Sequence, residues 1–340
     1  MHLQLKNSAY AAPSQQTGIA LITVLLVVAL AVIVTTHMIE RLQLQMQRNT
    51  NIQTNEQAYW YAMGAEAFAK TLLQQVKKKS PSITTLQQAW AQKAQSYPVD
   101  NGEISGKIID LQACFNLNAL REKTTDYSVG KKSVLRKAFE SLIVNLNIEG
   151  VGQFEAEYMT DALVDWLDSN SDIVSAGGAE DSDYEAKAFP YLAANNLLAS
   201  VNELRVIEHF NVTVIKKLKD FVCVIPENDQ LRIDVNTVQA SQAPMIAAIL
   251  GTNTTVADVQ EALTARSEKG FQSVDEFFQQ PQFSHSKIGS DVKQYFTVNS
   301  DYFKLLSTAK FANSYFKLTS IMKIVNNQQV TVIGRTIGID

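Results

Sequence analysis

The most constraining feature of this chain is an uninterrupted apolar run near its start, residues 19–39, which reads IALITVLLVVALAVIVTTHMI. About 20 apolar residues in a helix span the ~30 Å hydrocarbon core of a bilayer. Thr23 is the only polar side chain between Ile19 and Val34, and a threonine hydroxyl in a helix can bond to its own backbone. The first charge after the run is Glu40, so the segment is predicted to cross a membrane once.

The helical pattern continues past this run, because no proline occurs between Ile19 and Ser80 and only Gly64 interrupts. One helix of about 60 residues, ~90 Å long, is therefore predicted. Its first half would lie in lipid, and residues 42–76 would form an amphipathic half that packs against protein, including partner chains. The predicted apolar stripe at i, i+4 spacing consists of Trp60, Phe68, Leu72 and Val76, with Tyr59 and Met63 beside it.

The segment before the apolar run allows two interpretations. Residues 1–18 contain Lys6 and Pro13, and the small residue Gly18 directly precedes Ile19. Cleavage after Gly18 would leave the apolar segment on the mature chain, which is the layout of type IV pilin precursors. The alternative is an ordinary signal anchor that retains a short cytoplasmic tail.

Composition and spacing exclude several classes of protein. The formal net charge of −4 gives no electrostatic footprint for nucleic acid. The four histidines are not spaced as metal ligands would be. The chain also contains no CxxC pair, nucleophile elbow or glycine-rich phosphate loop. Cys114 and Cys223 are the only cysteines. They can form at most one disulfide in an oxidising compartment, and the sequence leaves that pairing open.

The rest of the chain reads as strands on either side of a helical block, an α+β arrangement. A short helix is expected over residues 82–96, and a half-buried strand over 107–117, where every second residue is apolar. Capping-box spacing occurs at Ser200 with Glu203 and at Ser273 with Glu276. Helices are predicted over residues 133–145, 153–167, 200–208, 213–222, 243–250, 256–267 and 273–279. Three strands follow at 303–311, 316–324 and 330–337, with a turn at 326–329.

One segment, residues 165–184, carries a specific constellation of oxygen ligands. Three of them occupy alternate positions, two glycines then allow a sharp turn, and three carboxylates return. Clustered carboxylates repel unless a cation lies between them, and calcium accepts about six to eight oxygen ligands in irregular geometry. The loop is not a complete EF-hand, because Asp168 at position one places Ala179 at position twelve. The predicted metal ligands are Asp168, Asn170, Asp172, Glu180, Asp181 and Asp183. The alternative is a solvated acidic loop.

Several stretches together resemble the K-type minor pseudopilins of type II secretion systems, in the family's order from Gly18 over nearly the whole chain. They are QQTG before IALITVLLVVALAVIVTT, EQAYWYAMGAEAFAK, DLQACFNLNAL, DALVDWLD followed by GGAEDSDY, and SVNELRVI. The resemblance implies a pilin-like fold, in which the long helix packs on an antiparallel sheet, with a large inserted all-helical domain. It also implies that this insert binds one or two structural calcium ions.

The resemblance further implies how the chain is processed and placed. A prepilin peptidase would cut between Gly18 and Ile19 and the new amine would be methylated. The mature chain would sit in the bacterial inner membrane as a single-pass protein, with its C-terminal domain in the periplasm. Its fifth mature residue is Thr23, where most pilin-type subunits have a glutamate that pairs with the amine of a neighbour. Lack of that glutamate is usual for the K type. It fits a subunit at the tip of the fibre, which has no further subunit above it to pair with.

The resulting prediction is a non-enzymatic minor pseudopilin. With the I-type and J-type minor pseudopilins it would form the tip complex that initiates and caps the periplasmic pseudopilus. The major pseudopilin and the inner-membrane assembly platform are the other expected partners. One alternative is a signal-anchored periplasmic hydrolase with its metal in the acidic loop, which processing at Gly18 argues against. The other is a DNA-binding type IV minor pilin, which the acidic charge argues against.

The predicted organisation follows the same resemblance. The leader is residues 1–18, the transmembrane half of the helix 19–40, and the periplasmic helix with the first part of the pilin-like domain 41–117. The inserted domain is 118–290, with two SAM-like subdomains at about 118–230 and 231–290. The C-terminal strands occupy 291–340.

Overall fold

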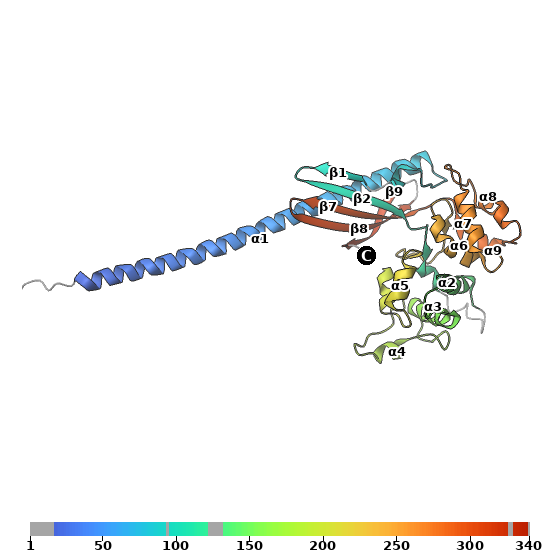
Figure 1. The fold of residues 1–340 in the computed structure, drawn as a ribbon, viewed down its shortest axis with the longest axis horizontal. Coiled ribbons are helices and arrows are strands. Elements are labelled where there is room, and N and C mark those ends of the chain that lie inside the picture. The colour runs from blue at the N-terminus through green and yellow to red at the C-terminus, as the bar shows by residue number, and fades with distance from the viewer. Residues whose placement is uncertain (1–16, 93–94, 122–131, 326–328, 339–340) are drawn as a thin grey trace, which may run out of the picture. The chain divides into compact units, whose positions relative to one another are not determined.

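The computed structural model describes residues 17–92, 95–121, 132–325 and 329–338. The chain divides into two units, Met1–Glu56 and Gln57–Asp340. Helix α1, Thr17–Lys79, is 63 residues long and runs from the first unit into the second (Figure 1), which confirms the single long helix. Thr17 and Gly18 are the only residues of the predicted leader that lie within the described part of the chain.

A five-stranded antiparallel sheet forms the centre of the pilin-like part, in the order β1-β2-β7-β8-β9. Its strands are β1 Gln95–Val99, β2 Gly102–Asp110, β7 Tyr302–Phe311, β8 Ser314–Val325 and β9 Gln329–Ile337. The three strands predicted at 303–311, 316–324 and 330–337 are confirmed as β7, β8 and β9, and buried and partly exposed residues alternate along most of β7. The predicted turn at 326–329 lies outside the described residues apart from Gln329.

The helix predicted over residues 82–96 is wrong. Over the described residues of this segment the structure has a short 3₁₀ turn, Ala89–Ala91, and from Gln95 strand β1, which pairs with β2. Trp90 anchors the turn by packing edge-to-face on Phe303, with ring centroids 5.2 Å apart. Pro98 is tolerated in β1 because this strand lies at the edge of the sheet. Tertiary pairing therefore overrides a short local helical pattern.

The strand predicted over residues 107–117 is also shifted. The sheet strand β2 ends at Asp110, and the chain then leaves the sheet before a two-residue strand, β3 Phe115–Asn116. The start of β2 is fixed by Gly102, because a Cβ there would lie 2.0 Å from the Lys310 carbonyl oxygen on the neighbouring strand. Only glycine permits this approach of two backbones.

The face of α1 that packs on the sheet includes Leu72 and Val76 of the predicted stripe but not Trp60 or Phe68. Trp60 is 63% exposed and Phe68 is 58% exposed, so those two large side chains point away from the core. The buried face is made of small and charged residues together with one leucine: Ala58, Ala62, Glu66, Ala69, Leu73 and Lys77. Large side chains already cover the sheet, including Phe303, Leu305 and Met322. Small residues on the helix let the two layers approach closely.

The helical block lies between β2 and β7 in the sequence and holds the largest hydrophobic cluster. Its helices are α2 Val134–Asn145, α3 Gln153–Leu167, α4 Asp181–Glu185, α5 Val212–Leu218, α6 Ala243–Leu250, α7 Val256–Thr264, α8 Val274–Phe278 and α9 Ser290–Lys293. Ser133 caps α2 by accepting a hydrogen bond from the Arg136 amide, as expected for a serine N-cap. The segment predicted as a helix at 200–208 is a 3₁₀ turn, Val201–Arg205, with its capping box formed.

Two short parallel strand pairs lie within this block. They are β3 with β4 Val222–Cys223, and β5 Ile233–Asp234 with β6 Phe296–Thr297. Helix α5 ends at Leu218, earlier than the predicted helix at 213–222, because residues 222 and 223 form strand β4. The predicted fold class is confirmed, with these strand pairs added to the helical insert.

A disulfide joins Cys114 and Cys223, whose Cα atoms are 5.8 Å apart and which are separated by 109 positions in the sequence. The bond lies where β3 and β4 pair. The sequence left this pairing open, and the structure settles it. The disulfide makes the first part of the insert, residues 114–223, a covalently closed loop.

Candidate functional site

The first half of the predicted metal loop begins at the end of α3. Asp168 caps that helix and is 1% exposed. Its Oδ1 accepts a hydrogen bond from the Asn170 amide at 3.0 Å, and Asn170 Oδ1 accepts one from the Asp172 amide at 2.7 Å. The alternate spacing seen in the sequence thus forms two successive side-chain-to-backbone turns. Asp172 itself is exposed.

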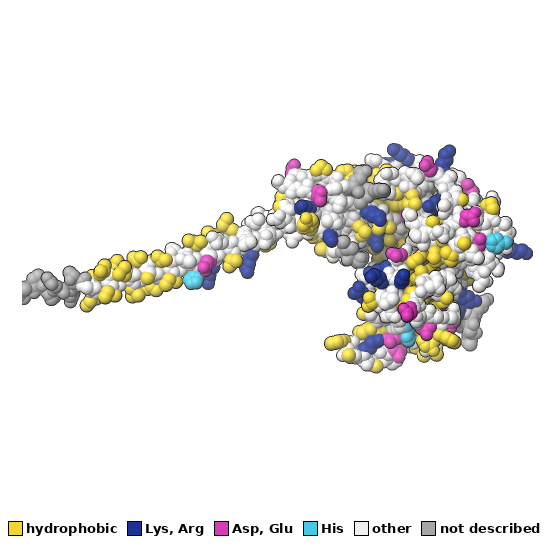
Figure 2. All heavy atoms as spheres, in the orientation of Figure 1, with side chains coloured by type: hydrophobic (Ala, Val, Ile, Leu, Met, Phe, Trp, Pro, Cys, Tyr) yellow, Lys and Arg dark blue, Asp and Glu magenta, His cyan; other side chains and the backbone are white. Residues whose placement is uncertain are grey.

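The second half of the loop begins helix α4. Glu180 is the N-cap residue, and its backbone amide donates to Asp183 Oδ2 at 3.0 Å. Asp181 Oδ1 accepts from the Ala193 amide at 3.0 Å. Asp181 and Asp183 therefore each fix the loop backbone. Figure 2 shows acidic side chains at the surface around α4.

A further carboxylate, Asp165, was missed by the sequence reasoning. It is fully buried on α3, and it accepts hydrogen bonds from the amides of Val174 and Ala179, both at 3.0 Å. A Cβ at Gly178 would lie 2.1 Å from Asp165 Oδ2, so the glycine makes room for this carboxylate. The available signal was its position three residues before Asp168, since i and i+3 share a helix face.

Burial and mutual repulsion set the charge of these groups. Burial raises the pKa of Asp165 to about 8, and the Glu180 and Asp168 carboxylates add to the rise against the two backbone donors. Burial also raises the pKa of Glu180 to about 7, with Asp168 and Asp181 adding to it. These directions mean that the protein by itself does not compensate the negative charge gathered here.

Glu180 gives the clearest test of whether a cation suits this loop. It is 3% exposed, and neither of its carboxylate oxygens has a hydrogen-bond partner. Among the described residues no three Asp, Glu, His or Cys side chains already converge on one point as metal ligands do. Asp165, Asp168 and Glu180 are nevertheless buried carboxylates, the ligand type that calcium accepts, and both oxygens of Glu180 lack a hydrogen-bond partner.

A second feature is the exposed surface of α1. Residues 18–53 are exposed all round the helix, and apolar side chains dominate its first part (Figure 2). The segment Gly18–Lys79 contains a stretch of mean hydropathy 3.0, long and apolar enough to cross a membrane, and none of that stretch is buried. A single N-terminal helix of this kind is compatible with a membrane anchor.

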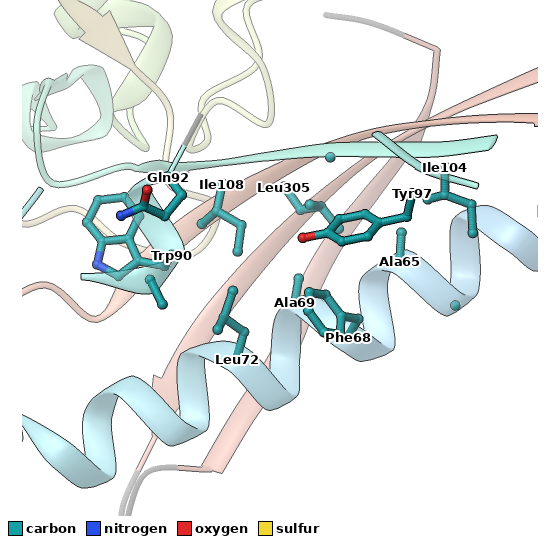
Figure 3. A pocket seen from close by; sticks show the side chains of 13 residues that line it. Ala65, Phe68, Ala69, Leu72, Trp90, Gln92, Tyr97, Ile104, Ile108 and Leu305 are labelled. Atoms are coloured by element: carbon teal, nitrogen blue, oxygen red, sulfur yellow. The ribbon is translucent and has the colours of Figure 1, made fainter. Parts of the chain in front are cut away.

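Further along, α1 borders an apolar groove of about 480 Å³ beside the first hairpin of the sheet. Phe68, Ala69 and Leu72 from the helix face Tyr97, Ile108 and Trp90 across it (Figure 3). Gly64 and Ala65 extend the same wall. The groove therefore continues the exposed face of α1 that carries Phe68.

With this geometry in place, comparison with known proteins is decisive. Two family models described as type II secretion system (T2SS), protein K match residues 113–227 and 233–299. The type II secretion system protein K of Aeromonas hydrophila is 34% identical, with 95% of this chain and 98% of that protein covered. The chain belongs to the type II secretion system protein K family. The resemblance inferred from the sequence is confirmed.

Other relatives agree with this assignment. The protein K of Klebsiella pneumoniae is 33% identical over 96% of this chain and 95% of its own length. A solved chain from the GspK-GspI-GspJ complex of enterotoxigenic Escherichia coli superposes with a TM-score of 0.77 at 28% identity. It covers 86% of this chain and all of the solved chain. Family membership favours the pseudopilin interpretation over the hydrolase and DNA-binding alternatives.

Proposed function

We propose that this chain is a minor pseudopilin that joins I-type and J-type minor pseudopilins in the complex that starts and caps a type II pseudopilus. The observation that carries the proposal is the match, over 86% of the chain, to a member of the GspK-GspI-GspJ complex. In that role the chain is a structural subunit and not an enzyme. The major pseudopilin and the inner-membrane assembly platform are the proposed further partners.

The start of α1 supports the proposed processing and placement. Prepilin peptidase would cut between Gly18 and Ile19, leaving the apolar helix as the inner-membrane anchor and the unit Gln57–Asp340 in the periplasm. At the fifth mature position, Thr23 Oγ1 lies 3.1 and 2.9 Å from the backbone oxygens of Ile19 and Ala20, so its one hydrogen is donated within the helix. The threonine is thus satisfied within its own helix and offers no charge to the amine of another subunit.

The exposed face of α1 supports a role in assembly. Trp60 and Phe68 remain largely exposed, and Phe68 lies at the groove beside Tyr97. Exposed aromatic side chains beside a groove are typical anchors of protein–protein interfaces. We assign contacts with the partner pseudopilins to this face, within residues 42–76.

Calcium would be held in the loop between α3 and α4. Asp168 and Glu180 from the predicted ligand set, together with Asp165, are the buried donors, and Asn170 and Asp172 in the loop and Asp181 and Asp183 in α4 are the further candidate ligands. When bound, the ion would supply the positive charge that this loop lacks. Its role would be structural, because the loop fixes the end of α3 relative to α4.

Assembly can be tested by co-expressing the chain with the I-type and J-type subunits of the same organism and measuring the complex by size-exclusion chromatography with light scattering. The wild-type chain is expected to form a three-component complex. Trp60→Ser combined with Phe68→Ser is expected to weaken it by at least about tenfold, as for loss of interface anchors. Restoration of secretion in a strain that lacks protein K provides the second readout.

Phe189→Ser is the matched control, because Phe189 is an aromatic residue of the insert that is 87% exposed. This variant is expected to assemble like the wild type. Failure of the wild-type chain to form the complex or to restore secretion would refute the proposed function. A fully assembled double variant would refute only the assignment of the interface to this face of α1.

A further inference from the structure

A second group of buried carboxylates lies where the segment matched by the second family model, residues 233–299, joins the sheet. Asp110 is the last residue of β2, Asp234 lies in β5, and Ser300 stands just before β7. Their exposed fractions are 3%, 0% and 0%. The two aspartates come from positions 124 apart in the chain and meet only in the folded structure.

The hydroxyl of Ser300 lies between the two carboxylates. Ser300 Oγ is 2.5 Å from Asp110 Oδ2 and 2.9 Å from Asp234 Oδ2. A serine hydroxyl carries one hydrogen, so it donates to only one of them. The other contact is a hydrogen bond only if that carboxyl carries a proton. Thr237 Oγ1, 2.6 Å from Asp110 Oδ2, uses its own hydrogen on the same carboxylate.

The charged groups around the pair do not compensate two negative charges. Lys77 on α1 is buried, and its Nζ lies 3.6 Å from Asp301 Oδ1 and donates to Asn299 Oδ1. Arg266 donates to the backbone oxygens of Val235 and Val238. Lys77 therefore already faces a third carboxylate. Burial lowers the pKa of Lys77 and that of Arg266. Both cations attract Asp234, but they do not offset its burial, since the pKa of Asp234 stays raised.

We propose that Asp110 and Asp234 share one proton across Ser300, and that losing this proton as the pH rises loosens the joint between residues 233–299 and the sheet. The joint consists of a few specific bonds around Gln112. Its carbonyl accepts from the Asp234 amide at 2.7 Å, its Nε2 donates to the Arg232 carbonyl, and its Oε1 accepts from the Asp301 amide at 2.6 Å. Repulsion between ionised Asp110 and ionised Asp234 would push the two chain segments apart and weaken these hydrogen bonds.

The direction of the titration agrees with this geometry. Burial raises the pKa of Asp110 to about 6 against its serine and threonine donors. Burial and then the Asp110 charge raise the pKa of Asp234 well above its ordinary value. The folded joint thus holds more protons than the open one above the unfolded pKa of about 4, so its stability falls as the pH rises. For one proton shared by the pair that titrates near pH 6, the value for Asp110, opening becomes about tenfold more favourable between pH 5 and pH 8.

The test is hydrogen exchange of the full-length chain in detergent, followed by mass spectrometry at pH 5 and pH 8 and corrected for the intrinsic exchange rate. In the wild type, protection of peptides from β5 and β6, relative to peptides from β7 and β8, is expected to fall about tenfold or more. In Asp234→Asn the amide supplies a permanent hydrogen in place of the proton, and the fall is expected to vanish. Asp220→Asn, at an exposed position, is expected to behave like the wild type.

Ser300→Ala provides a second variant, because it removes the bridging hydroxyl and keeps both carboxylates. It is expected to retain a fall in protection between pH 5 and pH 8. Equal pH dependence in wild type and Asp234→Asn would overturn the proposal. So would a wild type whose β5 and β6 protection does not change with pH, a result that decides the question even if Asp234→Asn does not fold.

Discussion

The two buried acidic groups differ in the hydrogen-bond donors that reach them. The pair Asp110 and Asp234 is surrounded by hydroxyls and backbone amides, and a lysine lies nearby. In the loop between α3 and α4, Glu180 has no hydrogen-bond partner for either oxygen. Burial raises the pKa of carboxyls in both places. The hydrogen-bond donors around Asp110 and Asp234 therefore suit a pair that shares a proton. The lack of donors at Glu180 suits a carboxylate that binds a cation.

A third buried acid, Glu66, is stabilised in its charged form by an ion pair. Glu66 on α1 accepts from Arg335 Nε and Nη2, both at 2.8 Å, and from Ser320 Oγ at 2.6 Å. These hydrogen bonds and the arginine charge lower its pKa despite the opposing effect of burial. One chain thus stabilises buried carboxylates with a fixed arginine, and we infer that it uses a shared proton and a bound calcium ion for the others.

The largest effect is expected from the disulfide, which separates the two acidic groups. The α3–α4 loop lies inside the closed segment 114–223, whereas Asp110 and Asp234 lie outside it. Replacing Cys114 and Cys223 with serine should lower the free energy of unfolding by about 4.7 kcal/mol, the loop-closure value for a loop of roughly 100 residues. Urea denaturation with and without reductant measures this loss.

Reduction of the double serine variant should have no further effect, which is the control. Hydrogen exchange should show the greatest loss of protection in α2 and α3. Equal loss in β7 and β8 would mean that the disulfide stabilises the whole unit and does not separate the two regions.

The next largest effect concerns Glu180. Glu180→Gln removes an unpartnered buried charge, so without calcium this variant should melt at a higher temperature than the wild type. Calcium at about a hundredfold excess over its Kd should stabilise the wild type by about 2.7 kcal/mol and leave the variant almost unchanged. Differential scanning calorimetry with calcium and with chelator measures both.

Glu185→Gln, at an exposed position in α4, is the matched control and should respond to calcium like the wild type. A variant at Glu180 that retains the full calcium response would remove this residue from the site. A wild type that shows no response would refute the proposed calcium site.

The smallest effect is expected at Glu66. Glu66→Gln keeps the shape but weakens the charged hydrogen bonds to Arg335, and should cost about 1–2 kcal/mol near pH 7. Because the folded pKa of Glu66 is lowered, its contribution is present above the unfolded pKa of about 4.3 and is lost as the pH falls below it. The pH dependence of urea denaturation from pH 3 to 7 tests this sign.

This slope is opposite to the one expected for Asp110 and Asp234. Arg335→Gln should reproduce the loss at pH 7, since it removes the other partner of the same ion pair. A Glu66→Gln curve parallel to that of the wild type below pH 5 would show that the ion pair does not contribute to stability.

Local patterns predicted those elements whose boundaries depend on nearby residues. Helix α3 begins and ends where the pattern over residues 153–167 placed it, and α2 begins after its serine cap. The acidic loop was recognised from alternate spacing, yet Asp165 was not, because its role depends on Gly178 coming close to it. The helix predicted over residues 82–96 failed because pairing with β2 outweighs local propensity.

The sequence by itself determined the long apolar helix, the insertion of a helical block between strands, the acidic loop and the family. Each of these depends on composition or spacing along a continuous stretch. Only the tertiary structure decided which face of α1 packs on the sheet, that Cys114 pairs with Cys223, and that Asp110 meets Asp234 across Ser300. These outcomes depend on contacts between distant segments, whose partners no local pattern specifies.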